Sequence, residues 1–262
     1  MLGAVVGDII GSTYEYSGNK EKYFFPLFHP HSFFTDDSVL TLAVADGLMK
    51  GGTENDFAQA LHDWGRRYPD AGYGSSFLSW LEDEMPLAYN SFGNGSAMRV
   101  SPVAWFYDTL EEVEEAALRT AIVSHSHPEG IKGAQATAAA IFLARTGKEK
   151  LDIAQYITDQ YGYDLSPTCD DIRPHYHFDV TCQGTVPQAI IAWLDSDCFE
   201  DAVRNAISLG GDADTLAAIT GAIAQADYGI PPLIAAEAFR RLDAPLRDVL
   251  LRFERQVMAG KV

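Results

Sequence analysis

Apolar residues recur at intervals of three and four along most of the chain, with polar residues between them. This spacing puts the apolar side chains on one face of a helix and predicts amphipathic helices. Besides the apolar opening segment LGAVVGDIIGS, the predicted helices are Asp36–Lys50, Asn55–Arg67, Ser96–Tyr107, Leu110–Val123, Gly130–Thr146, Lys148–Tyr161, Val186–Asp195, Phe199–Leu209, Asp214–Tyr228 and Ile234–Met258, the last with a break at Pro245. Alternating strand patterns are scarce, so the sequence predicts an all-α protein of more than ten helices.

Glycine and proline are dispersed and mark the junctions between predicted helices, as at Gly72–Gly74, Gly93–Gly95 and Gly210–Gly211. No linker, tail or low-complexity segment divides the chain, which predicts one domain over residues 1–262. The segment Tyr163–Gln183 carries two prolines and several aromatic residues. We expect it to be an irregular loop over a cleft.

The composition is strongly acidic, with 37 Asp and Glu against 19 Lys and Arg and a formal net charge of −18. This charge repels phosphate backbones and anionic lipids, so we expect neither extended nucleic-acid binding nor membrane association. No apolar run is long enough to span a bilayer. Cys169, Cys182 and Cys198 have no metal-binding spacing, which favours reduced thiols and a cytoplasmic location.

Two acidic groups stand directly in front of apolar helices, TDDS from Thr35 to Ser38 and GDADT from Gly211 to Thr215. One capping oxygen suffices for a helix start, and acidic residues in the first turn also suit the helix dipole. Two independent, solvated helix caps are therefore one interpretation. The other is that the carboxylates converge on a hard divalent cation such as Mg²⁺ or Mn²⁺, because neither group has a Lys or Arg beside it.

Weaker signals point to other ligands. An EF-hand interpretation of Asp212 and Asp214 fails because Leu216 and Ala217 follow where a ligand and a glycine are needed. The pairs His125/His127 and His175/His177 suit zinc only within a strand, and neither pair lies in a predicted strand, so polar loop histidines are the alternative.

The segment SFGNGSAMRVSP, Ser91 to Pro102, places Gly93, Asn94, Gly95 and Ser96 at a predicted helix start, where exposed N–H groups favour an anion. The loop lacks the Walker ending and the third glycine of a dinucleotide fingerprint, and an ordinary capped turn has the same sequence. Glu15 stands between Tyr14 and Tyr16. A carboxyl group between aromatic rings can have an altered pKa useful for acid–base chemistry, whereas the alternative is an exposed glutamate at a helix end.

Taken together, the motifs GAVVGDIIGSTYE, FTDDS, GYGSSF, GNGSAMRVSP, SHSHPEG and LGGDADTLAAITGAIAQADYG resemble the ADP-ribosylglycohydrolase family. They occur in the family's order and cover most of the chain. The resemblance implies an all-α domain with a dinuclear metal cleft, and a hydrolase that removes ADP-ribose from a modified target. It also implies that the protein acts on an ADP-ribosylated protein or on a small-molecule or nucleobase conjugate, and releases ADP-ribose.

The resemblance also assigns roles to residues of this chain. It implies that two Mg²⁺ or Mn²⁺ ions are held by Thr35, Asp36, Asp37, Asp212, Asp214 and Thr215. The candidates for guiding or deprotonating water are Glu15, Asp36 and Asp214. The segments implied to hold ADP-ribose contribute Gly72, Gly74, Ser91, Phe92, Gly93, Asn94, Gly95, Ser96 and His125, with Phe92 beside the adenine and His125 near the diphosphate.

Two small departures from the family pattern are Ser38 and Ala213, where relatives often carry Thr. Neither position is a principal ligand. A non-catalytic ADP-ribose-binding or structural protein of the same fold remains an alternative. The intact acidic groups argue against it, because a protein without catalysis has no need to hold so much negative charge together.

Overall fold

The computed structural model describes residues 1–84 and 87–259, which contain fifteen helices and no β-sheet, as the hydrophobic pattern predicts. The first eight helices are α1 Leu2–Gly11, α2 Asp36–Lys50, α3 Glu54–Arg67, α4 Ser75–Glu82, α5 Gly95–Met98, α6 Val103–Phe106, α7 Leu110–Ile122 and α8 Pro128–Arg145. The remaining seven are α9 Lys150–Tyr161, α10 Cys169–Ile172, α11 Cys182–Leu194, α12 Phe199–Leu209, α13 Ala213–Tyr228, α14 Pro232–Arg241 and α15 Ala244–Ala259.

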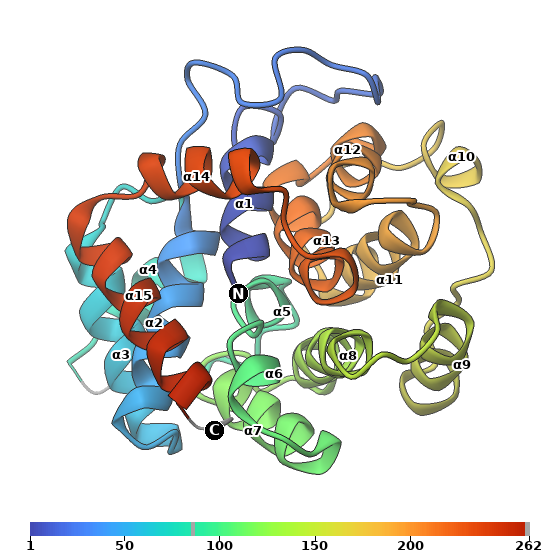
Figure 1. Cartoon of the computed structure of the whole chain (residues 1–262). Coiled ribbons are helices and arrows are strands. Elements are labelled where there is room, and N and C mark those ends of the chain that lie inside the picture. Colours follow the sequence, from blue (N-terminus) through green and yellow to red (C-terminus); the bar gives the residue numbers. More distant parts are fainter. Residues whose placement is uncertain (85–86, 260–262) are drawn as a thin grey trace.

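Helices α1 and α13 lie at the centre of the molecule and pack backbone against backbone (Figure 1). A Cβ atom on Gly3 would stand 2.1 Å from the carbonyl oxygen of Gly221, and one on Gly7 would stand 1.9 Å from that of Ala217. A Cβ atom on Gly11 would meet the start of α13, 2.5 Å from the Cα of Asp214. The two helices are therefore antiparallel, and the end of α1 meets the beginning of α13.

The other helices surround this central pair. Helices α2, α3, α4 and α15 lie on one side of it, and α8, α11 and α12 lie on the other, with α9 and α10 beyond them (Figure 1). Their apolar faces form one continuous hydrophobic core that reaches from Met1 to Phe253. None of the helices in the described residues combines the length and the apolarity that crossing a membrane requires.

Two predicted helices are each divided in the structure. The expected helix Ser96–Tyr107 is wrong, because α5 ends at Met98 and α6 begins only after Pro102, whose ring and missing N–H disfavour a continuous helix. The C-terminal helix does divide, but at Leu242 and Asp243 and not at Pro245. Pro245 lies in the first turn of α15, where its missing N–H costs no hydrogen bond.

The segment Tyr163–Gln183 is mostly irregular, with two exceptions. The short helix α10 begins with a capping box between Thr168 and Asp171, and α11 already begins at Cys182. An isolated antiparallel bridge joins Thr181 to Gly93. This bridge brings the irregular segment against the glycine-rich loop before α5.

Candidate functional site

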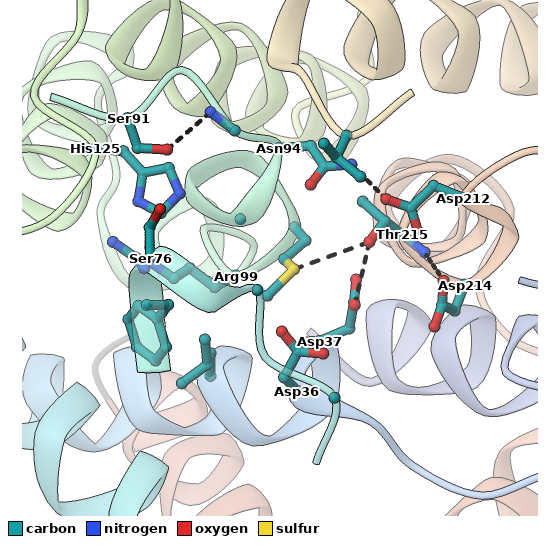
Figure 2. Close-up of a pocket in the computed structure, with 18 of the residues that line it drawn as sticks. Asp36, Asp37, Ser76, Ser91, Asn94, Arg99, His125, Asp212, Asp214 and Thr215 are labelled. Carbon is teal, nitrogen blue, oxygen red and sulfur yellow. Dashed lines mark hydrogen bonds between the residues drawn. The ribbon is translucent and has the colours of Figure 1, made fainter. Parts of the chain in front are cut away.

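A cavity of about 390 Å³ opens where the starts of α2, α4, α5 and α13 face one another (Figure 2). Its volume lies within the range of small-molecule sites. The predicted residues that line it are Glu15, Asp36, Asp37, Gly72, Gly74, Ser91, Gly93, Asn94, Gly95, His125, Asp212, Asp214 and Thr215. The structure thus brings together residues from both ends of the chain.

The first acidic group forms the start of α2. Thr35 is the N-cap, and its side chain accepts a hydrogen bond from the backbone N–H of Asp37 at 3.3 Å. Asp37 is buried, and its Oδ1 has no hydrogen-bond partner. Asp36 is partly exposed on the cavity wall, below Gly72. A Cβ atom on Gly72 would stand 3.4 Å from Oδ1 of Asp36, so glycine lets this turn approach the carboxylate.

The second acidic group forms the start of α13. Gly210 and Gly211 both have positive φ angles, of 73° and 81°, and turn the chain from α12 into Asp212. Such a turn is open to glycine and strained for other residues. Asp212 Oδ2 accepts a hydrogen bond from Nδ2 of Asn94 at 2.7 Å, and Asp214 Oδ1 accepts one from the backbone N–H of Thr215 at 3.0 Å.

The two acidic groups meet directly, although they are far apart in sequence. The hydroxyl of Thr215 donates to Oδ2 of Asp37 at 3.2 Å, as Figure 2 shows. One carboxylate oxygen from each of Asp8, Asp37 and Asp214 lies within 4.8 Å of the others. The same holds for Glu15, Asp212 and Asp214, so Asp214 joins two overlapping clusters. The interpretation as two independent, solvated caps therefore does not fit this arrangement.

No basic side chain compensates the acidic cluster within the described residues. Burial, followed by repulsion from neighbouring carboxylates, raises the pKa of Asp36, Asp37 and Asp214 well above the usual value. Burial also raises the pKa of Asp212, against hydrogen bonds that lower it. A cluster of carboxylate and hydroxyl oxygens that includes an unpartnered buried oxygen, with no basic side chain against it among the described residues, suits hard divalent ions.

Asp8 belongs to this site, although its sequence motif predicted no role for it. It is fully buried in α1 and accepts hydrogen bonds from the backbone N–H and the hydroxyl of both Thr35 and Ser38. Burial raises its pKa to about 6, although these four bonds oppose the shift. A carboxylate in the middle of an otherwise apolar helix was the signal in the sequence that marks such a residue.

Glu15 stands at the rim of the acidic end. Burial raises its pKa, as do the charges of Asp212 and Asp8, whereas a hydrogen bond with Tyr16 opposes the rise. The ring of Tyr16 stacks on that of Phe178, with centroids 5.5 Å apart. Both rings line the cavity, so the irregular segment after α10 supplies part of its wall next to Glu15.

Ser91, at the beginning of the loop before α5, and His125 lie at the opposite end of the cavity (Figure 2). The hydroxyl of Ser91 accepts a hydrogen bond from the N–H of Gly93 at 3.0 Å. Ser96 is buried outside the cavity lining, and its hydroxyl donates to the carbonyl of Gly130 at 2.7 Å. Phe92 is half-exposed, lies edge-on to His127, and is also absent from the lining.

Arg99 is a further lining residue, which the sequence analysis quoted only as part of a motif. Its side chain is fully buried, and burial lowers the pKa of its guanidinium to about 10. It lies at the end of the cavity away from the aspartates, as Figure 2 shows. The cavity therefore has an acidic end and a basic end.

The structure gives no support to a histidine-based zinc centre. His127 caps α8, where its Nδ1 accepts a hydrogen bond from the N–H of Glu129 at 3.1 Å. Among the described residues, the side-chain groups placed to hold a metal contain carboxylates and no histidine. Cys169 and Cys182 are free thiols whose pKa burial raises to about 12, which disfavours a cysteine nucleophile.

The fold and the cavity define a helical protein with a carboxylate-lined cavity at its helix starts. The sequence profile of ADP-ribosylglycohydrolases matches residues 1–260, and the chain belongs to that family. It is 25% identical over 307 residues to the ADP-ribosylhydrolase ARH3 of Mus musculus, covering 88% of this chain and 83% of the relative. It is also 25% identical over 258 residues to the ADP-ribosylarginine hydrolase Tri1 of Pseudomonas putida, covering 88% and 70%.

A solved structure described as an ADP-ribosylglycohydrolase-related protein complex has the same fold. It superposes with a TM-score of 0.69, at 25% sequence identity, over 98% of this chain and 97% of that one. The predicted fold class and family are therefore confirmed.

Proposed function

We propose that this protein is a metal-dependent hydrolase that cleaves the N- or O-glycosidic bond between ADP-ribose and a modified target. The observation that carries the proposal is the division of one cavity into an acidic end and a basic end. Five carboxylates line the acidic end, from Glu15, Asp36, Asp37, Asp212 and Asp214. Arg99 supplies the positive charge of the basic end, with the uncharged ring of His125 beside it, and Asn94 of the Gly93–Gly95 loop reaches Asp212 at the acidic end. An ADP-ribosyl group has matching parts, a ribose rich in hydroxyls and an anionic diphosphate.

The acidic end suits two divalent cations, Mg²⁺ or Mn²⁺. Asp36, Asp37, Asp212, Asp214 and Thr215 line this end and would hold them, since their carboxylate and hydroxyl oxygens are the donors that hard cations prefer. Thr35 is absent from the lining and would support this group from the N-cap of α2, where its hydroxyl is bonded to Asp8 and to the N–H of Asp37. Bound there, the ions would supply positive charge that orients the ribose hydroxyls and a water molecule. They would also offset the repulsion among the buried carboxylates.

The predicted reaction breaks the bond between the anomeric carbon of the distal ribose and the nitrogen or oxygen of the target. A water oxygen bonds to the anomeric carbon as the bond to the target breaks. One water proton passes to a carboxylate and is then given to the departing nitrogen or oxygen, while the other stays on the new ribose hydroxyl. Positive charge develops on the ribose in the transition state, as in other glycosidases. Glu15, Asp36 and Asp214 are the candidates for orienting and deprotonating the water, and their negative charge favours that transition state.

The basic end suits the remaining part of ADP-ribose. The ring of His125 lines the cavity where the diphosphate would lie, beside Gly93 and Gly95. The N–H groups of Gly93 and Asn94 already donate to the Ser91 hydroxyl and the Val180 carbonyl, so His125 is the donor proposed for the diphosphate. Phe92, half-exposed at the edge of that loop, remains the candidate for a contact with the adenine. The target would then leave past Tyr16 and Phe178, beside Glu15. A protein side chain, a nucleobase or a small molecule each provides the N- or O-linked atom that this reaction needs.

The test is release of free ADP-ribose from arginine-, serine- and nucleobase-linked conjugates, each assayed with Mg²⁺, with Mn²⁺ and with a chelator. We expect release with metal from at least one conjugate, and its loss with the chelator. Asp36→Asn and Asp214→Asn should lower activity at least about 100-fold, because each removes a charged group at the reacting centre. Circular dichroism should show that both variants keep their helices.

Asp46→Asn is the matched control. Asp46 lies in α2 like Asp36 and is buried, but it pairs with Trp64 and Lys50 and does not line the cavity. This variant should keep full activity. Binding of ADP-ribose without release from any conjugate, in the presence of metal, would overturn the hydrolase and favour the ADP-ribose-binding alternative.

A further inference from the structure

Arg99 carries a buried positive charge that no carboxylate neutralises. Among the described residues, no ion pair includes it. Its Nη2 donates to the carbonyl of Thr120 and to the hydroxyl of Ser124, both at 2.7 Å. Its Nε and Nη1 have no hydrogen-bond partner. Since buried charges are costly unless compensated, a lone guanidinium beside a cavity favours an anion there.

Ser124 connects Arg99 to the imidazole of His125. The Ser124 hydroxyl oxygen lies 2.8 Å from Nδ1 of His125. A guanidinium donates and never accepts, so the Ser124 oxygen accepts from Arg99. Among the described residues Nδ1 of His125 is the acceptor found for the Ser124 hydroxyl hydrogen, and a buried hydroxyl whose hydrogen has no acceptor is unfavourable. Nδ1 is then an acceptor, and in a neutral ring the hydrogen must be on Nε2.

The neutral state of the ring follows from its surroundings. His125 is buried, and burial together with the nearby charge of Arg99 lowers its pKa well below the usual value. The ring therefore remains uncharged at neutral pH. It can still donate one hydrogen bond, through Nε2.

Nε2 points toward the glycine-rich loop. A Cβ atom on Gly95 would stand 3.1 Å from Nε2, and one on Gly93 would stand 3.5 Å from it. Both glycines and His125 line the cavity, and no described residue accepts a hydrogen bond from Nε2. The N–H of His125 is thus open to a ligand at the basic end.

We propose that Arg99 and Ser124 are positioning residues that fix His125 in its Nε2–H form, so that the ring donates a hydrogen bond to an anionic oxygen of the bound ligand. Arg99 donates to the Ser124 oxygen, and the Ser124 hydroxyl then donates to Nδ1 of His125. The identity of the anion, the diphosphate of an ADP-ribosyl group, rests on the proposed function. The tautomer does not, because it follows from the protein's own hydrogen bonds.

The experiment measures the ring nitrogens of ¹⁵N-histidine-labelled protein by NMR, with His125→Gln identifying the His125 signals. We expect wild-type protein to show Nε2 protonated and Nδ1 unprotonated. Ser124→Ala should lose this preference, and Ser124→Thr, which keeps the hydroxyl, should restore it. Arg99→Lys keeps a cationic donor and should also retain it, whereas Arg99→Met should not.

Ligand binding and kinetics separate this role from a merely structural one. ADP-ribose should shift the His125 Nε2 signal in wild-type protein. Ser124→Ala should weaken ADP-ribose binding and raise KM by about tenfold, the effect of one hydrogen bond to a charged group, while kcat changes by less than about twofold. Ser101→Ala is the matched control, since Ser101 is buried and its hydroxyl has no partner.

Each outcome bears on a different claim. A protonated Nδ1 in wild-type protein, or an unchanged tautomer in both Ser124→Ala and Arg99→Met, would overturn the role of Arg99 and Ser124. The Nε2–H form without any response to ADP-ribose would overturn the diphosphate as its partner. Failure to release ADP-ribose from every conjugate would contradict the proposed hydrolase and leave the tautomer measurement standing.

Discussion

Asp8 accepts hydrogen bonds from both Thr35 and Ser38 in the first turn of α2. Like an N-cap side chain, it accepts hydrogen bonds from backbone N–H groups at the start of α2, but it lies in another helix, α1. Thr35 is still the N-cap of α2, since its hydroxyl accepts a hydrogen bond from the backbone N–H of Asp37. Asp8 therefore positions the first acidic group and does not only add charge to it.

We predict that Asp8→Asn weakens metal binding without removing a proposed ligand. The amide would turn one acceptor into a donor facing the donors of Thr35 and Ser38, which costs about 1–3 kcal/mol of stability. A displaced supporting residue typically costs about 10- to 100-fold in metal affinity. Calorimetric titration with Mn²⁺ measures the change in metal affinity, and urea unfolding in chelator measures the change in stability. Asp46→Asn is the control. An unchanged Mn²⁺ affinity would show that Asp8 has no positioning role.

At the scale of the elements, the contact between α1 and α13 decides where the carboxylates lie. The helices touch through Gly3 and Gly7 on one side and through Ala217 and Gly221 on the other. Because they are antiparallel, the chain leaving α1 toward Glu15 passes the start of α13 at Asp214. Helix propensity alone makes these glycines look unfavourable, since it counts only the cost of glycine within one helix.

We predict that Gly7→Ala destabilises the protein, although alanine is the better helix former. Its Cβ would lie 1.9 Å from the carbonyl oxygen of Ala217, so the helices must move apart. Such overpacking costs about 1–3 kcal/mol, against a propensity gain of about 1 kcal/mol. Urea unfolding measures the difference.

Gly65→Ala in α3 is the matched control for this prediction. There the added Cβ would meet only the side chain of Leu81, whose methyl groups can shift. Its effect on the free energy of unfolding should be smaller than that of Gly7→Ala. Equal effects in the two variants would mean that the contact between α1 and α13 is not the sensitive feature.

At the scale of the whole molecule, the cavity is closed by segments from the entire chain. The walls come from Glu15 and Tyr16 near the beginning, from residues within 72–77 and 89–99, from His125, Phe178 and Val180, and from Asp212, Asp214 and Thr215 near the end. One continuous core lies behind these walls. Both features suit the prediction that residues 1–262 form a single domain.

We predict that urea unfolds the protein in one cooperative transition, with the same midpoint by far-UV circular dichroism and by tryptophan fluorescence. Trp64 lies in α3 and Trp193 in α11, on opposite sides of α1 and α13, so the tryptophan fluorescence samples both sides of the molecule. Mg²⁺ at about 100 times its Kd should add about 2.7 kcal/mol, because it binds the folded cluster.

Asp36→Asn should remove this stabilisation by Mg²⁺, and Asp46→Asn should retain it. Two separate transitions, or different midpoints by the two signals, would contradict the single domain. Equal unfolding curves with Mg²⁺ and with chelator would contradict metal binding at the acidic end.

Some of this protein was readable from residue spacing. The intervals of three and four predict most of the helices, and the bounds of α2 agree at both ends. The helix α4 was not predicted, and Pro102 divided a helix that the apolar pattern made continuous. The spacing of apolar residues indicates which face of a helix is buried, and it needs several turns to be recognised. A short helix gives too few turns, and a proline ends a helix without changing the apolar spacing.

The sequence by itself determined the helical class, the family and which acidic groups stand at helix starts, because each depends on neighbours in the chain. Tertiary structure alone decided that Asp37 and Thr215 touch, that Asp8 supports α2, and that Ser124 links Arg99 to His125. The reason is physical. Burial, charge repulsion and the direction of a hydrogen bond depend on distances between segments, and those distances are fixed only when α1 and α13 pack together.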